Sequence, residues 1–243
     1  MILLDFEGDY GRTYNSNIRH LIPAYDAILE IGAAALAAHA PQAHSALVVG
    51  PGSGTELPAL LAALPDAQFT LVEPSAQMRG FCEALIADLG AADRFCWGPP
   101  QLEDTTALAQ GPFDAVISHN VLHVLPPPQQ QQLLDRMAAQ LAPGGLLVLS
   151  SYSEPDPQTM EPWLAIARAR FQAAGMDHAM IDGVMASRGI TVFSLDQGLL
   201  ESRLNAAGLE PPSLLLQALC NRLWCSWRPA QPHQGGSTGP IHS

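Results

Sequence analysis

The sequence has no lysine: its 11 basic residues are all arginine and face 23 acidic residues, so the formal net charge at pH 7 is -12. An acidic surface repels phosphate backbones and anionic lipid headgroups. We therefore expect no nucleic acid and no membrane as a partner. The absence of lysine also excludes Schiff-base chemistry and a lysine general base.

Cysteines and long apolar runs are also scarce. The four cysteines form no CxxC pair, which predicts neither a zinc site nor a disulfide framework, and we expect no bound metal. No apolar run reaches the ~18–20 residues of a membrane span. The start, MILLDFEGDY, lacks the basic and apolar regions of a signal peptide. These absences predict a cytoplasmic protein.

Apolar residues are abundant, at 48% of 243, and they are arranged in a regular alternation between residues 46 and 150. Short apolar runs predict strands at 46–50, 69–73, 94–97, 114–118 and 146–150. Helical patterns lie between them at 55–64, 75–89 and 129–141. This alternation is typical of βαβ units, which place strands in a parallel sheet covered on both faces.

The segments on either side of this alternation differ from it. Residues 1–45 predict an N-terminal helical lid, with helices at 16–20 and 25–39. Residues 153–193 predict a helical cap inserted into a main domain that spans 46–228. A capping-box pattern at Ser194-Leu195-Asp196-Gln197 predicts a helix to Asn205. Strands at 213–219 and 221–227 would form a hairpin, and the tail 229–243 has the composition of a disordered segment.

One motif carries the chemistry. In VVGPGSGTE, Gly50, Gly52 and Gly54 follow a predicted strand and precede a predicted helix. Glycines allow a tight turn and the close approach of a ligand. Glu73 ends the next strand, where an acidic side chain can accept both hydroxyls of a ribose. The combination predicts a nucleoside site.

Four segments in order, VVGPGSGTE, FTLVEPS, FDAVISHNVLHVLPP and LAPGGLLVLS, resemble class I S-adenosyl-L-methionine (SAM)-dependent methyltransferases. Residues 195–227 resemble the last two strands of that family, and YNSNIRHLIPAY resembles the lid of a bacterial subgroup that acts on small molecules or tRNA wobble precursors. The resemblance implies an α/β, Rossmann-like, doubly wound sheet of seven strands, mostly parallel, with a C-terminal antiparallel hairpin.

The resemblance also implies SAM as cofactor. It would place the methionine moiety on the three glycines and the ribose on Glu73. The segment after the third strand departs from the family pattern of an acidic residue followed by an apolar one, and Gln101 would serve there through its amide. The remaining residues expected at the cofactor are Pro74, Leu102, Ser118, Tyr14 and Arg19.

Candidates for the reacting centre follow the fourth and fifth strands. His119 can act as a general base, Asn120 can orient an amine or carboxylate, and Tyr152 lies at the same edge of the sheet. For His119, capping a helix or stacking on adenine is an equal alternative. His123 would lie one helical turn beyond His119 on the same face.

The leading interpretation is a methyltransferase that acts on a small-molecule acceptor, as a monomer or a homodimer. A second interpretation keeps the fold and consumes SAM differently, as azetidine-2-carboxylate synthases or carboxy-SAM synthases do. A third is a SAM-binding protein without catalysis. Neither the motifs nor their spacing name the acceptor.

Overall fold

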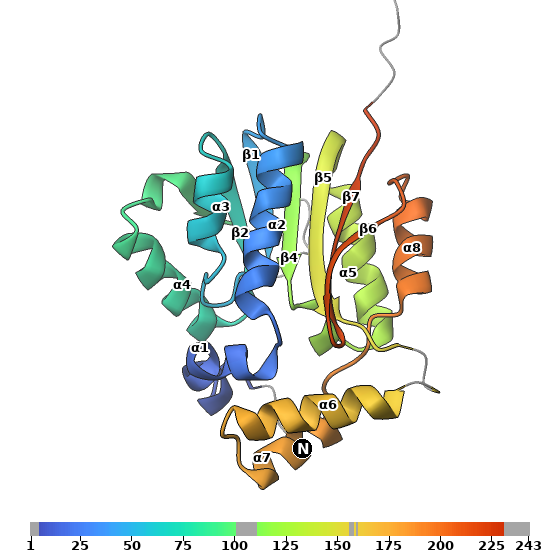
Figure 1. Cartoon of the computed structure of the whole chain (residues 1–243). Coiled ribbons are helices and arrows are strands. Elements are labelled where there is room, and N and C mark those ends of the chain that lie inside the picture. Colours follow the sequence, from blue (N-terminus) through green and yellow to red (C-terminus); the bar gives the residue numbers. More distant parts are fainter. Residues whose placement is uncertain (1–4, 101–110, 156–157, 159, 231–243) are drawn as a thin grey trace, which may run out of the picture.

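The computed structural model describes residues 5–100, 111–155, 158 and 160–230. Its centre is a seven-stranded sheet with the order β3-β2-β1-β4-β5-β7-β6. Strands β1 to β5 run parallel to their neighbours, and β7 runs antiparallel to both β5 and β6 (Figure 1). The predicted fold class is thereby confirmed. The strands are β1 (Ser45–Val49), β2 (Gln68–Val72), β3 (Phe95–Trp97), β4 (Phe113–His119), β5 (Leu141–Tyr152), β6 (Ser213–Ala218) and β7 (Asn221–Trp227).

Helices cover both faces of the sheet, as the alternation of the sequence predicts (Figure 1). One face carries α2 (Tyr25–His39), α3 (Leu57–Ala63) and α4 (Ala76–Asp88), and the other carries α5 (Pro127–Ala139) and α8 (Gln197–Ala206). After a polar first residue, β1 and β2 are mainly apolar because both of their faces are buried.

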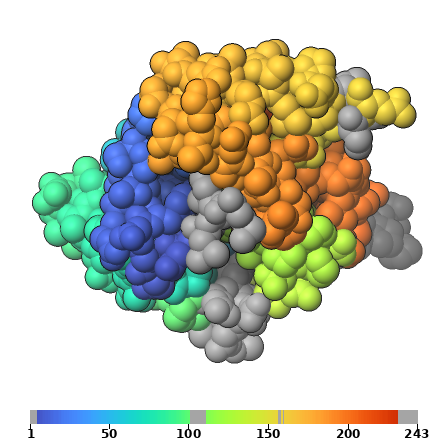
Figure 2. Space-filling view, turned by 90° about the horizontal axis from the view of Figure 1, so that it is seen from below, coloured from blue at the N-terminus to red at the C-terminus, as the bar shows by residue number. Residues whose placement is uncertain are grey.

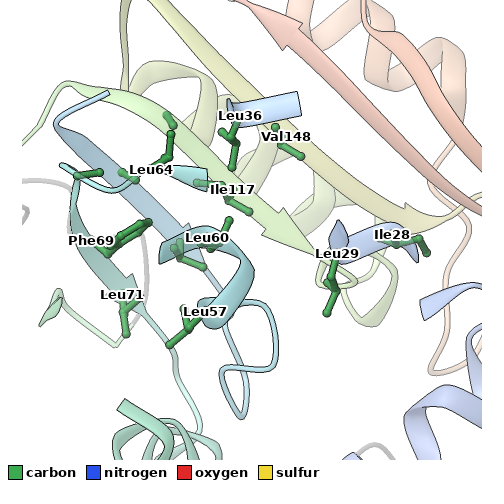
Figure 3. Close-up of a cluster of buried hydrophobic side chains, with 14 of the residues drawn as sticks. Ile28, Leu29, Leu36, Leu57, Leu60, Leu64, Phe69, Leu71, Ile117 and Val148 are labelled. Carbon is green, nitrogen blue, oxygen red and sulfur yellow. The ribbon is translucent and has the colours of Figure 1, made fainter. Parts of the chain in front are cut away.

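The larger core lies between the sheet and helices α2, α3 and α4. Figure 3 shows Leu57 and Leu60 of α3, and Leu64 directly after it, on the side of Phe69 and Leu71 of β2. All five side chains are at most 1% exposed. This packing fixes the end of β1 and the start of α3, and so the loop between them.

The lid and the cap lie at the carboxyl edge of the sheet (Figures 1 and 2). We use "lid" for α1 (Asp9–Leu21) and "cap" for α6 (Met160–Ala173) and α7 (His178–Ala186). Arg170 of the cap donates to the backbone carbonyls of Arg19 and His20 at the end of the lid helix. Because the last carbonyls of a helix lack intrahelical donors, this cation satisfies them and joins cap to lid.

Two local predictions are corrected. Strand β5 begins at Leu141, which pairs with Phe113 of β4, and not at residue 146 as predicted, so Pro143-Gly144-Gly145 lies inside the strand. Helix α8 is capped by Asp196, whose carboxylate accepts from the Leu199 N–H at 2.7 Å. Ser194, the predicted cap, instead accepts from the Glu154 N–H.

Among the described residues, no single helix is long and apolar enough to cross a membrane. Helices α1 and α2 together have the length and apolar composition of a membrane span, but they are bent by 88° relative to each other.

The core packing predicts a clear stability difference between two leucines. Leu60→Ala should lower the free energy of unfolding by about 2–5 kcal/mol, because it removes a buried side chain and leaves a cavity. Leu89→Ala, at a position 38% exposed, is the matched control and should cost less than about 1 kcal/mol. Urea denaturation followed by circular dichroism measures both, and equal losses would contradict this account of the core.

Candidate functional site

The glycine loop between β1 and α3 has the conformation that its sequence requires. Gly50 and Gly52 have φ angles of 70° and 56°, which side chains rarely adopt. A Cβ on Gly50 would lie 2.3 Å from Cγ2 of Val121, so this position has no room for a side chain. The close packing of Val121 therefore requires glycine at position 50, which also forms part of the wall of a cavity.

Glu73 at the end of β2 holds this loop in place. Its Oε2 accepts from the Gly52 N–H at 2.9 Å, and its Oε1 accepts from the Ser75 N–H at 2.9 Å. Burial raises the pKa of Glu73, while these two donors oppose the rise. A carboxylate oxygen has further acceptor capacity, so the side chain can still accept hydroxyl groups from a ligand.

A cavity of about 400 Å³ begins at the glycine loop, and we call it the loop cavity. This volume falls in the usual range for small-molecule sites. Of the predicted cofactor residues, Gly50 and Pro74 line it. Gln101 and Leu102 lie outside the described residues. The other lining residues are Val49, Val72, Pro100, Val121, Leu125, Gln129, Gln132, Leu133 and Arg136.

A second cavity of about 140 Å³, the cap cavity, lies beneath the lid and the cap. Most of its wall is apolar: the lid side contributes Ile18, Leu21 and Ile22, and the cap contributes Trp163, Leu164 and Phe171. Polar groups enter from Tyr10, His123, Tyr152, Arg170, Arg188 and Asn221. A small apolar ligand with one or two polar groups matches this wall.

Tyr152 belongs to a charged group in the wall of the cap cavity. Its hydroxyl donates to Oε1 of Glu154 at 2.7 Å, and Arg188 pairs with the same oxygen at 2.6 Å. Burial and the hydrogen bond to Glu154 raise the pKa of Tyr152. For Glu154, burial raises the pKa, but the hydrogen bonds from Arg188 and Tyr152 outweigh it and lower the pKa. Tyr152 therefore remains a protonated donor and does not act as a base.

His119 and His123 do not share a helical face, contrary to expectation. His119 is the last residue of β4, and His123 lies in the 3-10 turn η3 (Leu122–Val124). The His119 ring packs under α2, where a Cβ on Gly32 would lie 2.9 Å from its Cε1, and its Nδ1 lies 3.1 Å from Ser150 Oγ. Neither cavity wall, as far as it is described, includes His119, whereas His123 lines the cap cavity.

Burial lowers the pKa of both histidines to about 4, so both are neutral at pH 7. Of the two, His123 has the position of a proton acceptor, because it lies in the wall of the cap cavity. Its Nδ1 is buried without a hydrogen-bond partner among the described residues.

Asn120 has a strained backbone and an unsatisfied side chain. Its φ is 60°, and both of its amide atoms are buried without a partner in the described part of the chain. Such strain persists only where the surrounding structure imposes it. The next residue, Val121, lines the loop cavity. Asn120 therefore stays a candidate for contact with a bound molecule.

The remaining predicted site residues differ in their positions. Ser118 is 0% exposed and donates to the Val49 carbonyl, so it joins two strands and offers no hydroxyl to a ligand. Arg19 pairs with Asp26 at the surface. Tyr14 is partly buried in the lid, with its ring centroid 6.1 Å from that of Tyr10.

Sequence reasoning missed Glu56, Glu154 and Arg188. Glu56 stands in the quoted glycine motif without an assigned role, and it is 5% exposed. Glu154 and Arg188 lie 34 residues apart, and no periodicity links them. Among the described residues no three His, Cys, Asp or Glu side chains gather as a metal site would require.

The Glu154–Arg188 pair predicts a specific dependence of stability on pH. Because the pKa of Glu154 is lowered on folding, its contribution is present above the unfolded pKa of about 4.3 and is lost as the pH falls through the folded pKa. Glu154→Gln should therefore cost about 1–2 kcal/mol at pH 7, and this cost should shrink as the pH falls through the folded pKa.

Unfolding in urea at pH 7 and at pH 3 checks this expectation. Glu83→Gln is the control, since its partner Arg79 forms an exposed helical pair with little net effect. A loss in Glu154→Gln that stays constant down to pH 3 would contradict the assignment.

Comparison with known proteins agrees with this geometry. Residues 47–147 match the family model of a methyltransferase domain. An O-methyltransferase family protein from Burkholderia thailandensis has a similar structure, with a TM-score of 0.65 and 17% identity over 90% of this chain and 59% of that chain. Magnesium protoporphyrin IX methyltransferase from Synechocystis PCC 6803 with bound SAH gives a TM-score of 0.67 and 14% identity, over 92% and 96%.

Mitomycin 7-O-methyltransferase gives a TM-score of 0.60 and 20% identity, over 84% of this chain and 54% of that one. The chain thus spans little more than half of the length of the Burkholderia and mitomycin proteins. A comparison with curated protein sequences gives no significant match. The resemblance seen in the sequence is confirmed at the level of the fold: residues 47–147 match a methyltransferase-domain model, and the chain has the fold of the class I SAM-dependent methyltransferases.

Proposed function

We propose that this protein transfers the methyl group of SAM to a small, largely apolar acceptor held in the cap cavity. The observation that carries the proposal is the pair of cavities at the carboxyl edge of the sheet. One adjoins the glycine loop and Glu73, and the other is an apolar space under the lid and the cap. A transferase for a nucleoside cofactor and a separate acceptor needs two such compartments.

The loop cavity fits the nucleoside of SAM. Gly50 and Pro74, from the loops after β1 and β2, form part of its wall. Glu73, held by two N–H groups, presents a fixed carboxylate to the two ribose hydroxyls. Val72, Pro74, Pro100 and Val121 supply apolar contacts for an adenine ring. When bound, SAM supplies a methyl group that its sulfonium centre has already activated.

The cap cavity sets the size of the acceptor. An engineered apolar cavity of about 150 Å³ in another protein binds benzene. The cap cavity, at about 140 Å³, accordingly accommodates one six-membered ring. Tyr152 and Arg188 in its wall can fix a polar substituent on that ring.

The protein then has to position the acceptor, exclude water and remove a proton where the acceptor is a hydroxyl. Arg170 holds the cap against the lid and so excludes water from the cavity. His123, neutral and at the wall, takes the proton. We keep Asn120 and Tyr152 as positioning groups at this edge and give His119 no direct part, because it packs under α2.

The cofactor assignment predicts that Glu73→Gln weakens SAM binding by about 1.5–3 kcal/mol, or about 10- to 100-fold. The glutamine amide has only one acceptor oxygen. Its NH₂ group is a donor and would face the N–H of either Gly52 or Ser75, so one of these two hydrogen bonds is lost. Isothermal titration calorimetry measures the affinity, with the exposed Glu83→Gln as control. Unchanged affinity in Glu73→Gln would remove Glu73 from the site.

The acceptor assignment is tested by filling the cap cavity. Ala167 lines this cavity, whereas Ala169 lies exposed on the same helix. With SAM and a panel of single-ring phenols and ring carboxylates, the wild type should form S-adenosylhomocysteine together with a methylated ring. Ala167→Phe should lower the rate at least about tenfold with SAM affinity unchanged, while Ala169→Phe should behave as wild type.

Mass spectrometry of the products separates the alternatives. Methylthioadenosine formed from SAM without an acceptor would indicate chemistry on the methionine arm and overturn methyl transfer. Equal activity in Ala167→Phe and Ala169→Phe would place the acceptor outside the cap cavity.

A further inference from the structure

The wall of the cap cavity has a charge opposite to that of the chain. The chain carries 23 acidic and 11 basic residues, yet the described wall contains two arginines, Arg170 and Arg188, and no aspartate or glutamate. No ion pair among the described residues includes Arg170, whose hydrogen bonds go to the backbone carbonyls of Arg19 and His20. A cationic wall in an anionic protein favours an anionic ligand.

Arg188 is held in this wall by its Nε. That atom donates to Oε1 of Glu154 at 2.6 Å and to the hydroxyl oxygen of Tyr152 at 3.2 Å. The hydrogen bonds described for Arg188 all start from Nε, so the four N–H groups of its two Nη atoms remain for a ligand. A guanidinium fixed at one edge and open at its end suits a carboxylate, which binds through two parallel hydrogen bonds.

The rest of the wall limits the molecule that carries this anion. The volume of about 140 Å³ accommodates one six-membered ring, and Trp163, Leu164 and Phe171 supply apolar contacts for it. His123, the proton acceptor of the proposed function, lines the same small space. A ring that engages both polar groups therefore carries an anionic substituent for Arg188 and a hydroxyl group for His123.

We propose that the acceptor is a hydroxy-substituted single-ring carboxylate whose carboxylate binds the two Nη groups of Arg188, an inference that rests on the proposed function. A bond forms between the methyl carbon and the hydroxyl oxygen of the ring as the bond from that carbon to the sulfonium sulfur breaks. The sulfur keeps the electron pair and becomes a neutral thioether, and the hydroxyl proton passes to His123. The carboxylate does not react, so Arg188 determines which acceptor binds.

The test compares ligands of the same shape that differ in charge. These are the three hydroxybenzoate isomers and the matching neutral hydroxybenzamides. Isothermal titration calorimetry at pH 7 with saturating S-adenosylhomocysteine measures their binding without turnover. For the isomer that binds best, the wild type should bind the carboxylate about 10- to 100-fold more tightly than the amide. Arg188→Gln should bind the two with similar affinity.

Two further variants isolate the effect of the Arg188 charge. In Arg188→Gln the carboxylate of Glu154 loses its partner and would itself repel an anion. The double variant Arg188→Gln/Glu154→Gln removes that repulsion and should still show no preference for the carboxylate. Arg168→Gln is the matched control, because Arg168 belongs to the same cap, pairs with the exposed Asp182 and is absent from the described wall. It should keep the wild-type preference.

Turnover with SAM gives a second readout. Arg188→Gln should raise KM for the hydroxybenzoate by about 10- to 100-fold and change kcat by less than about threefold, because the carboxylate is bound equally before and during methyl transfer. For the amide, the variant and the wild type should have similar KM values. A general loss of packing in the cap would instead impair both substrates.

The outcomes separate this inference from the proposed function. Equal binding of carboxylate and amide by the wild type, or a preference that survives in the double variant, overturns the role of Arg188, and methylated rings would leave the function intact. A methyl ester as product overturns the inference, because the carboxylate would then be the methyl acceptor. A carboxylate preference that the double variant loses, without methyl transfer from SAM to any ring, supports the anion site and overturns the proposed function.

Discussion

The hydrogen bonds of one carboxylate determine the shape of the site. Glu73 ends β2 and accepts from Gly52 and Ser75, so it ties the glycine loop to the start of α4. It can do so because β1 and β2 are parallel and in register, with Val49 beside Val72. The loop that follows β1 and the residue that follows β2 are then neighbours. The loop cavity and the position of Glu56 depend on this bridge.

The parallel sheet could be predicted closely from the sequence, because its strands are buried on both faces. The apolar run in β1 and the run in β2 each fall within one residue of the observed bounds. Errors arose where local patterns compete with tertiary contacts. Ser194 fits a capping box, but its hydroxyl accepts from Glu154, which is 40 residues away, and Asp196 caps the helix. His119 and His123 suit a helix, but pairing with β5 extends β4 to His119.

Under the proposed function, the glycine-loop side of the site could be placed from the sequence more closely than the cap cavity, for a physical reason. The positions of Gly50, Gly52 and Glu73 follow from backbone geometry and from the ends of β1 and β2, which the order of the elements fixes. The acceptor side is built from contacts such as Glu154–Arg188 and the bonds of Arg170 to the end of α1, which join distant segments. Which polar groups reach the cap cavity is therefore visible only in the folded structure, where these distant segments lie in contact.

The two compartments also differ in charge, and the lid connects them. Glu56 and Glu73 lie on the glycine-loop side, in a chain whose net charge is -12, which suits a cationic cofactor. The cap cavity has an apolar wall in which Arg188 is already paired with Glu154. Tyr10 lines that cavity and contacts Tyr14, which faces Glu56. Under the proposed function, methyl transfer turns the sulfonium into a neutral thioether, so the attraction between the spent cofactor and this acidic side weakens when the reaction is complete.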